Sequence, residues 1–227
     1  MLDWDLGRGA SMERNLVRAL EFSPNDVLLL ERLSELNLLS YQAHHDPKWR
    51  KTYLAEMNTL SMRLLSVKPG SCQGQRVQGY VALFNDDYKT ATLRFREALK
   101  ADPEAPSADK VAAELTRAFY KQGKPADAEN FAGSYIIGRP GAMAVYDVLA
   151  EHYQGNSDHA KLVALLQKRI QSNPNDATSY LKLASAYSGA GQSVEMERVL
   201  EHLRADPSRF PNGLEQAGGG SLWIVRG

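Results

Sequence analysis

The 227-residue sequence contains a single cysteine, Cys72. An intrachain disulfide and any zinc site built from several cysteines are therefore excluded. Aromatic residues make up only 8% of the chain, whereas Ala and Leu recur throughout. This composition favours helices packed in layers over a core built from a sheet, so the expected fold class is all-α.

The chain has no excess of either charge, because Lys plus Arg and Asp plus Glu each number 27. Nucleic acid is therefore not an expected partner. The first residues show no apolar run typical of a signal peptide, and no later stretch is long and apolar enough for membrane insertion. We expect a soluble protein, cytoplasmic if the sequence is complete, with the periplasm as the alternative if it is a fragment.

Prolines recur at a nearly constant interval. Pro69 and Pro103 are 34 residues apart, as are Pro140 and Pro174, and Pro207 follows 33 residues after Pro174. Most of these prolines end a helix-forming run such as EALKADP or RIQSNP, because proline cannot continue a helix. This spacing predicts repeated helical units of about 34 residues.

The stretch 78–103, QGYVALFNDDYKTATLRFREALKADP, shows the order of residues within one unit. Gly79 and Ala91 are small where two antiparallel helices would approach, while Tyr88 and Phe95 would fill the space beside them. This order resembles the tetratricopeptide repeat family. The resemblance implies a right-handed α-solenoid of antiparallel helix pairs, and the alternative is an irregular helical bundle.

We expect one repeat domain over residues 1–207, of about five helix pairs with a partial first unit, followed by an irregular or flexible tail at 208–227. An insertion of about eleven residues near 41–51 should form a loop or an extended helix end on one rim, where binding functions often lie. The turn near 155–157 is about two residues shorter than the others. The expected helices are 11–22, 27–42, 48–67, two within 78–103, 111–122, 126–137, one around 146–153, one around 162–170, and a pair within 177–203.

The resemblance also implies a partner-binding concave face. Its candidate residues are Arg76, Tyr80, Phe84, Lys110, Arg117, Tyr120, Lys121, Asp147 and Glu151, with Gln73, Leu83, Ala113 and Gln154 beside them. This face is basic and aromatic in the middle and acidic further on. Arg and Tyr are enriched in protein interfaces, although a solvated helix face also alternates charge.

Family members that hold the end of a chaperone tail use a clamp of Lys, Asn and Arg. Here Arg76 matches the first basic member of that clamp, but the positions of its companions hold Tyr80, Glu114, Ala144 and Val148. Chaperone-tail binding is therefore not expected.

His44, His45 and Asp46 form the one cluster that resembles metal ligands. Adjacent residues point in different directions, so a solvated turn is the expected role. No nucleophile-elbow or phosphate-loop pattern is present, since Gly123-Lys124-Pro125 lacks the rest of such a loop. We expect no cofactor, no metal and no enzymatic activity, and an ordered metal at His44 would be the first sign otherwise.

The resulting hypothesis is a non-enzymatic scaffold, of bacterial character, that binds a peptide or helical segment of a protein partner. The alternative is the regulatory or targeting portion of a larger enzyme or of a secretion or envelope assembly. No polar capping helix is evident after Pro207. The tail packs on the last interface, or the chain is a fragment, or a second copy covers it by self-association.

Overall fold

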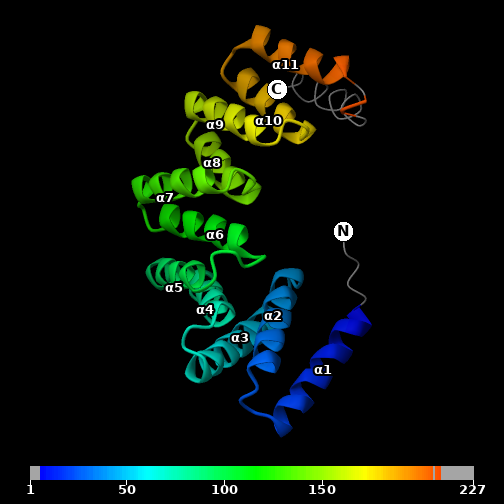
Figure 1. The fold of residues 1–227 in the computed structure, drawn as a ribbon, viewed down its shortest axis with the longest axis vertical. Helices are drawn as coiled ribbons and strands as arrows, with labels where there is room; N and C mark the ends of the chain where they lie inside the picture. Colours follow the sequence, from blue (N-terminus) through cyan, green and yellow to red (C-terminus); the bar gives the residue numbers. More distant parts are fainter. Residues whose placement is uncertain (1–5, 207, 211–227) are drawn as a thin grey trace. The chain divides into compact units, whose positions relative to one another are not determined.

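The computed structural model describes residues 6–206 and 208–210, and these residues form eleven helices and no strand (Figure 1). The predicted all-α class is confirmed. The chain divides into two compact units, Met1–Ala128 and Glu129–Gly227, and each is considered by itself. Helix α7 (Pro125–Gly138) spans the division. No helix in the described part of the chain combines the length and apolarity needed to cross a membrane.

The first unit is a series of helices in which each packs against the next. Helix α2 packs in addition against α4. The helices are α1 (Leu6–Phe22), α2 (Val27–Ala43), α3 (Pro47–Val67), α4 (Cys72–Phe84), α5 (Tyr88–Ala101) and α6 (Ala108–Lys121). Helix α1 begins five residues earlier than predicted, α4 begins six residues before the predicted 78–103 unit, and α6 begins three residues early. Helix α5 ends two residues before Pro103, as a helix-ending proline requires.

The second unit continues the same construction. Helix α9 packs against both α8 and α10, and α10 packs against α11. Their bounds are α8 (Met143–Gly155), α9 (His159–Ser172), α10 (Ala177–Gly189) and α11 (Ser193–Ala205). Asp158 and Asp176 accept hydrogen bonds from backbone amides at the starts of α9 and α10, which satisfies donors that have no partner within the helix.

The same three-residue turn joins consecutive helices at four places, between α4 and α5, α6 and α7, α8 and α9, and α10 and α11. Its central residue has a left-handed backbone, with φ of 59° at Asp86, 73° at Gly123, 55° at Ser157 and 71° at Gly191. The next amide donates to the carbonyl five residues earlier, as Asp158 does to Tyr153 over 2.9 Å. This is the helix-ending arrangement that a left-handed residue permits. The prediction of a shorter turn near 155–157 was wrong, because Ser157 adopts the conformation that Gly takes in two of the other turns.

The insertion near 41–51 extends two helices, which is one of the two predicted outcomes. Helices α2 and α3 have 17 and 21 residues, whereas the helices from α4 onward have 13 or 14. Asp46 caps α3 by accepting a hydrogen bond from the Lys48 amide over 2.8 Å, and Pro47 occupies the first turn. Proline suits that position because its missing N–H would have no partner there.

The predicted close approach within the 78–103 unit is present. A Cβ atom added to Gly79 would lie 2.5 Å from the ring of Phe95, so only glycine allows α4 this close to α5. Ala91 and Phe95 are fully buried. Tyr88, by contrast, is half-exposed, and its hydroxyl donates to Asp86 over 2.5 Å.

Phe210 is the last residue that the structure describes. It is 1% exposed and packs in a cluster with Tyr180 and Leu203. Its ring meets the rings of Tyr180 and His202 at 5.3 and 5.9 Å. The remainder of the predicted tail, residues 211–227, lies outside the described residues.

Candidate functional site

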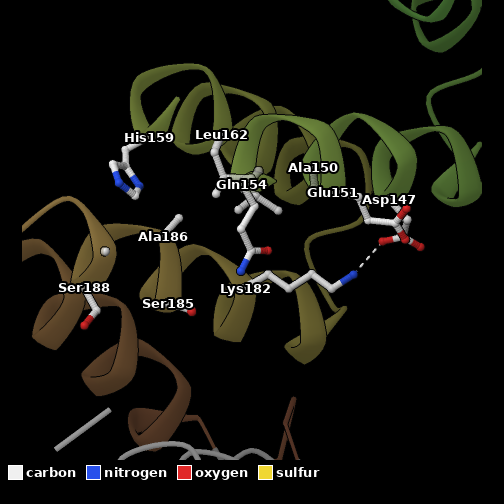
Figure 2. Close-up of a pocket in the computed structure, with 12 residues that line it drawn as sticks. Asp147, Ala150, Glu151, Gln154, His159, Leu162, Lys182, Ser185, Ala186 and Ser188 are labelled. Carbon is white, nitrogen blue, oxygen red and sulfur yellow. Dashed lines mark hydrogen bonds and ion pairs between the residues drawn. The ribbon is translucent and has the colours of Figure 1, made fainter. Parts of the chain in front are cut away.

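Helices α8, α9 and α10 border an open cavity of about 730 Å³ in the second unit (Figure 2). It contains two of the nine predicted groove residues, Asp147 and Glu151, together with Gln154. The full lining is Asp147, Ala150, Glu151, Gln154, His159, Leu162, Leu166, Lys182, Ser185, Ala186, Ser188 and Gly189. Three helices therefore converge on one hollow, at the scale typical of ligand-binding sites.

The cavity combines an apolar base with a polar edge. Ala150, Leu162 and Ala186 are buried, at 7%, 6% and 4% exposed, whereas Glu151 and Gln154 are exposed. The base offers contact area to an apolar side chain, and the edge offers hydrogen-bonding groups. An arrangement of this kind can bind a ligand by shape and orientation.

An ion-pair network stabilises one wall of the cavity. Lys182 of α10 reaches Asp147 of α8, with Nζ 2.5 Å from Oδ1 (Figure 2). Arg169 of α9 donates to the same carboxylate and also lies 3.5 Å from Asp176. Burial raises the pKa of Asp147, but the hydrogen bonds from Lys182 and Arg169 outweigh it, so the pKa lies below its usual value. The carboxylate is therefore held ionised and connects three helices.

The predicted groove residues on α4 are mostly buried. The Arg76 side chain is 8% exposed, pairs with Glu35 of α2, and donates to Gln73 Oε1 over 2.9 and 3.1 Å. Tyr80 is 5% exposed and packs edge-on against Phe95. Burial, with the charge of Glu114 acting in the same direction, raises the pKa of Tyr80 to about 12. These two side chains contribute mainly to packing within the first unit.

The other predicted residues of the first unit differ in exposure. Phe84 is half-buried and stacks on Tyr41 with ring centroids 4.1 Å apart. Arg117 pairs with Glu114 over 2.6 Å, and Tyr120 is half-buried. Lys110 and Lys121 are exposed. Partner binding by these side chains stays a prediction.

The His44–His45–Asp46 segment has a structural role. His44 stacks on Tyr53 and Trp49, with ring centroids 5.5 and 6.3 Å away. Asp46 caps α3, and His45 is exposed. Among residues 6–206 and 208–210, no three His, Cys, Asp or Glu side chains are placed to hold a metal ion together.

The cavity residues on α10 were not predicted from the sequence. The repeat layout was carried only as far as Gln154, yet one further period of 34 residues from Glu151 leads to Ser185 on the cavity edge. The periodicity therefore contained a signal for Ser185. Lys182 was harder to assign, because its role depends on reaching Asp147 in the preceding repeat.

No protein-family model matches the chain. No curated protein matches it either. Several solved structures are similar to the chain. PilW, described as a widely conserved type IV pilus biogenesis factor, has a TM-score of 0.64 at 16% identity, over 94% of each chain. A tetratricopeptide repeat protein from Parabacteroides merdae has a TM-score of 0.59 at 13% identity, over 95% of this chain and 88% of its own. YrrB, described as a TPR protein with an unusual peptide-binding site, has a TM-score of 0.52 at 16% identity, over 88% of this chain and 96% of its own.

Proposed function

We propose that this chain, which has the helical-repeat fold of the tetratricopeptide repeat proteins, is a protein-interaction module. It binds an extended segment of a partner protein in the cavity of α8, α9 and α10. The observation that carries this proposal is the open hollow of about 730 Å³, with a buried apolar base and exposed Glu151 and Gln154 at its edge. The peptide-binding site named for YrrB supports the same reading of the fold.

Binding would use the apolar base and the polar edge for different parts of the partner. One apolar side chain of the partner would occupy the surface formed by Leu162, Leu166 and Ala186. Backbone amides and carbonyls on either side would bond to Gln154 and Ser185, because an extended segment leaves these groups unpaired.

The ion-pair network would keep this cavity preformed. Asp147 is held by Lys182 and Arg169 of the same chain, so these side chains need little ordering when a partner arrives. A preformed site gains affinity because less conformational entropy is lost on binding.

A cavity-filling substitution tests the proposal. Peptides are selected from a random library against the wild-type chain, and their dissociation constants are measured by fluorescence anisotropy. Ser185 is exposed and lines the cavity, so Ser185→Trp should fill it and weaken binding by about tenfold or more. Ser134→Trp, at an exposed position of α7 outside the cavity lining, is the matched control and should bind as the wild type does.

Two outcomes would overturn the proposal. Unchanged binding by Ser185→Trp would place the peptide elsewhere, and failure to select any peptide would argue against a peptide-binding module. Circular dichroism of both variants shows whether a loss of binding reflects a loss of folding.

The second candidate function is a targeting or regulatory part of a larger assembly. It draws support from the likeness to PilW, whose description names pilus biogenesis and whose chain is covered over 94% of its length. The native mass in a cell extract separates the two candidates. A complex that stays assembled well above the 25.2 kDa of the chain favours the assembly role.

A further inference from the structure

A second cavity, of about 600 Å³, lies in the first unit and is bordered by α1, α2 and α3. Its base is apolar, with Leu20 and Leu33 buried and Val17 and Leu60 beside them. Helix α2 packs against both α1 and α3 and contributes the deepest lining residues. We call this hollow the α1–α3 groove. It shares no residue with the α8–α10 cavity, so binding in this groove is independent of the proposed function.

Asn37 is the unusual residue in the α1–α3 groove. It lines the groove at 1% exposed, on a helix whose other buried residues are mainly leucine. In the described part of the chain, its Oδ1 atom accepts no hydrogen bond. A buried acceptor without a donor opposes folding, and a leucine would fill the same site without that cost. Within the described residues, Asn37 therefore leaves an unpaired acceptor beneath the apolar base of the α1–α3 groove.

The edge of the α1–α3 groove is acidic. Glu13, Glu21 and Glu56 line it, against the single cation Arg63. Arg63 also donates toward Asn25 Oδ1 over 3.4 Å. Burial, followed by the negative charge of Glu13, raises the pKa of Glu56. A cationic group placed between Glu13 and Glu56 would relieve the repulsion between the two carboxylates.

We infer that the α1–α3 groove binds a basic amphipathic helix from a partner protein. Its leucine-like side chains would cover Leu20, Leu33 and Leu60, and its Lys or Arg side chains would pair with the acidic edge. A trough between helices is a shape that an amphipathic helix enters with one apolar face. The acidic edge disfavours an anionic lipid surface as the occupant.

Two synthetic helical peptides of roughly 15 residues serve as probes. Both carry leucine at the same positions along one face, and the other face carries lysine in one peptide and glutamate in the other. Fluorescence anisotropy of the labelled peptides measures affinity for the wild-type chain. The lysine peptide should bind about tenfold or more tightly than the glutamate peptide.

Matched variants on α3 locate the binding. Thr59 is exposed and lines the α1–α3 groove, so Thr59→Trp should lower affinity for the lysine peptide by about tenfold. Thr52 is exposed on the same helix outside the lining, and Thr52→Trp should bind as the wild type does. Glu56→Gln should weaken binding severalfold and reduce its dependence on salt, because one attracting charge is lost.

Three results would overturn the inference. They are similar affinity for both peptides, unchanged binding by Thr59→Trp, or an equal loss in Thr59→Trp and Thr52→Trp. Circular dichroism of each variant excludes unfolding as the cause. Ser185→Trp should leave lysine-peptide binding unchanged, so failure of this site and failure of the α8–α10 cavity are distinguishable.

Discussion

Predicted groove residues on helix α4 of the first unit are mostly buried, whereas those on helix α8 of the second unit are accessible. Arg76 and Tyr80 on α4 are 6% and 5% exposed, whereas Asp147 and Glu151 on α8 line an open cavity. Repeat spacing places a residue on a helix face. The partners across that face then decide whether the side chain supports the fold or remains available to a ligand.

Both units use an ion pair to connect alternate helices. Glu35 of α2 pairs with Arg76 of α4, and Asp147 of α8 pairs with Lys182 of α10. The Arg76 side chain is 8% exposed, while those of Asp147 and Lys182 are 39% and 41% exposed. Both members of the second pair therefore line the cavity, whereas in the first pair only Glu35, with a side chain 37% exposed, is accessible.

The tight packing of the first unit can be broken at Gly79. Gly79→Ala should lower the free energy of unfolding by roughly 2–3 kcal/mol, because its Cβ would lie 2.5 Å from the buried Phe95 ring. Urea unfolding followed by circular dichroism measures the change. A Cβ atom added to Gly133 on α7 would have no atom within 4 Å. Gly133→Ala should therefore raise the free energy of unfolding by up to about 1 kcal/mol. Equal effects of the two substitutions would contradict the close approach of α4 and α5.

Arg76 and Lys110 test the contrast between enclosed and exposed groove candidates. Arg76→Ala should lower the free energy of unfolding by about 2 kcal/mol, since Glu35 loses its ion pair and keeps only the Gln73 amide as a donor, while Gln73 Oε1 loses its donor. Solvent screening at Glu35, whose side chain is 37% exposed, keeps the loss below that of a fully buried pair. Lys110→Ala at an exposed position should change stability by less than about 0.5 kcal/mol. Equal urea midpoints for the two variants would show that Arg76 is not a packing residue.

Replacing Asp147 should destabilise the fold less than replacing Gly79 or Arg76, and its effect should depend on pH. Asp147→Asn should lower the free energy of unfolding by about 1 kcal/mol at neutral pH, because its ion pairs are partly exposed. In the folded chain the pKa of Asp147 lies below the usual 3.8. Its contribution to the free energy of unfolding is therefore complete at pH values above 3.8. The contribution is lost as the pH falls through the folded pKa.

The difference in stability between the wild type and Asp147→Asn should therefore be constant above about pH 5 and shrink below pH 4. Unfolding measured across this range at fixed salt gives the answer. A difference that persists unchanged at acid pH would show that the carboxylate charge does not hold α8 to α10.

Most of the fold could be predicted from local signals. Pro103 and Pro174 mark helix ends, and the Asn85-Asp86-Asp87 pattern marks a turn, because these depend on backbone geometry within a few residues. The turn at Ser157 was misjudged, since a left-handed serine has no clear sequence signature. Extended helices at the insertion were one of two predicted outcomes, and the Asp46-Pro47 start of α3 was not recognised from the sequence.

The candidate sites could be predicted only in part. The resemblance to the tetratricopeptide repeats implied that Asp147 and Glu151 share a helix face, and both line the cavity. Burial of Arg76 depends on Glu35, 41 positions earlier, and no local pattern indicates that pairing. The α1–α3 groove was missed for the same reason. Asn37 sits among the buried leucines of α2, and its unpaired acceptor becomes visible only once three helices are packed.

Amide chemical-shift mapping of a library-selected peptide on the full chain tests the account most directly. We predict that the largest shifts fall on residues lining the α8–α10 cavity, such as Ala150, Gln154 and Ser185, while Arg76 and Tyr80 of α4 stay unchanged. A footprint on α4 and α6 with no response from α8 to α10 would contradict it.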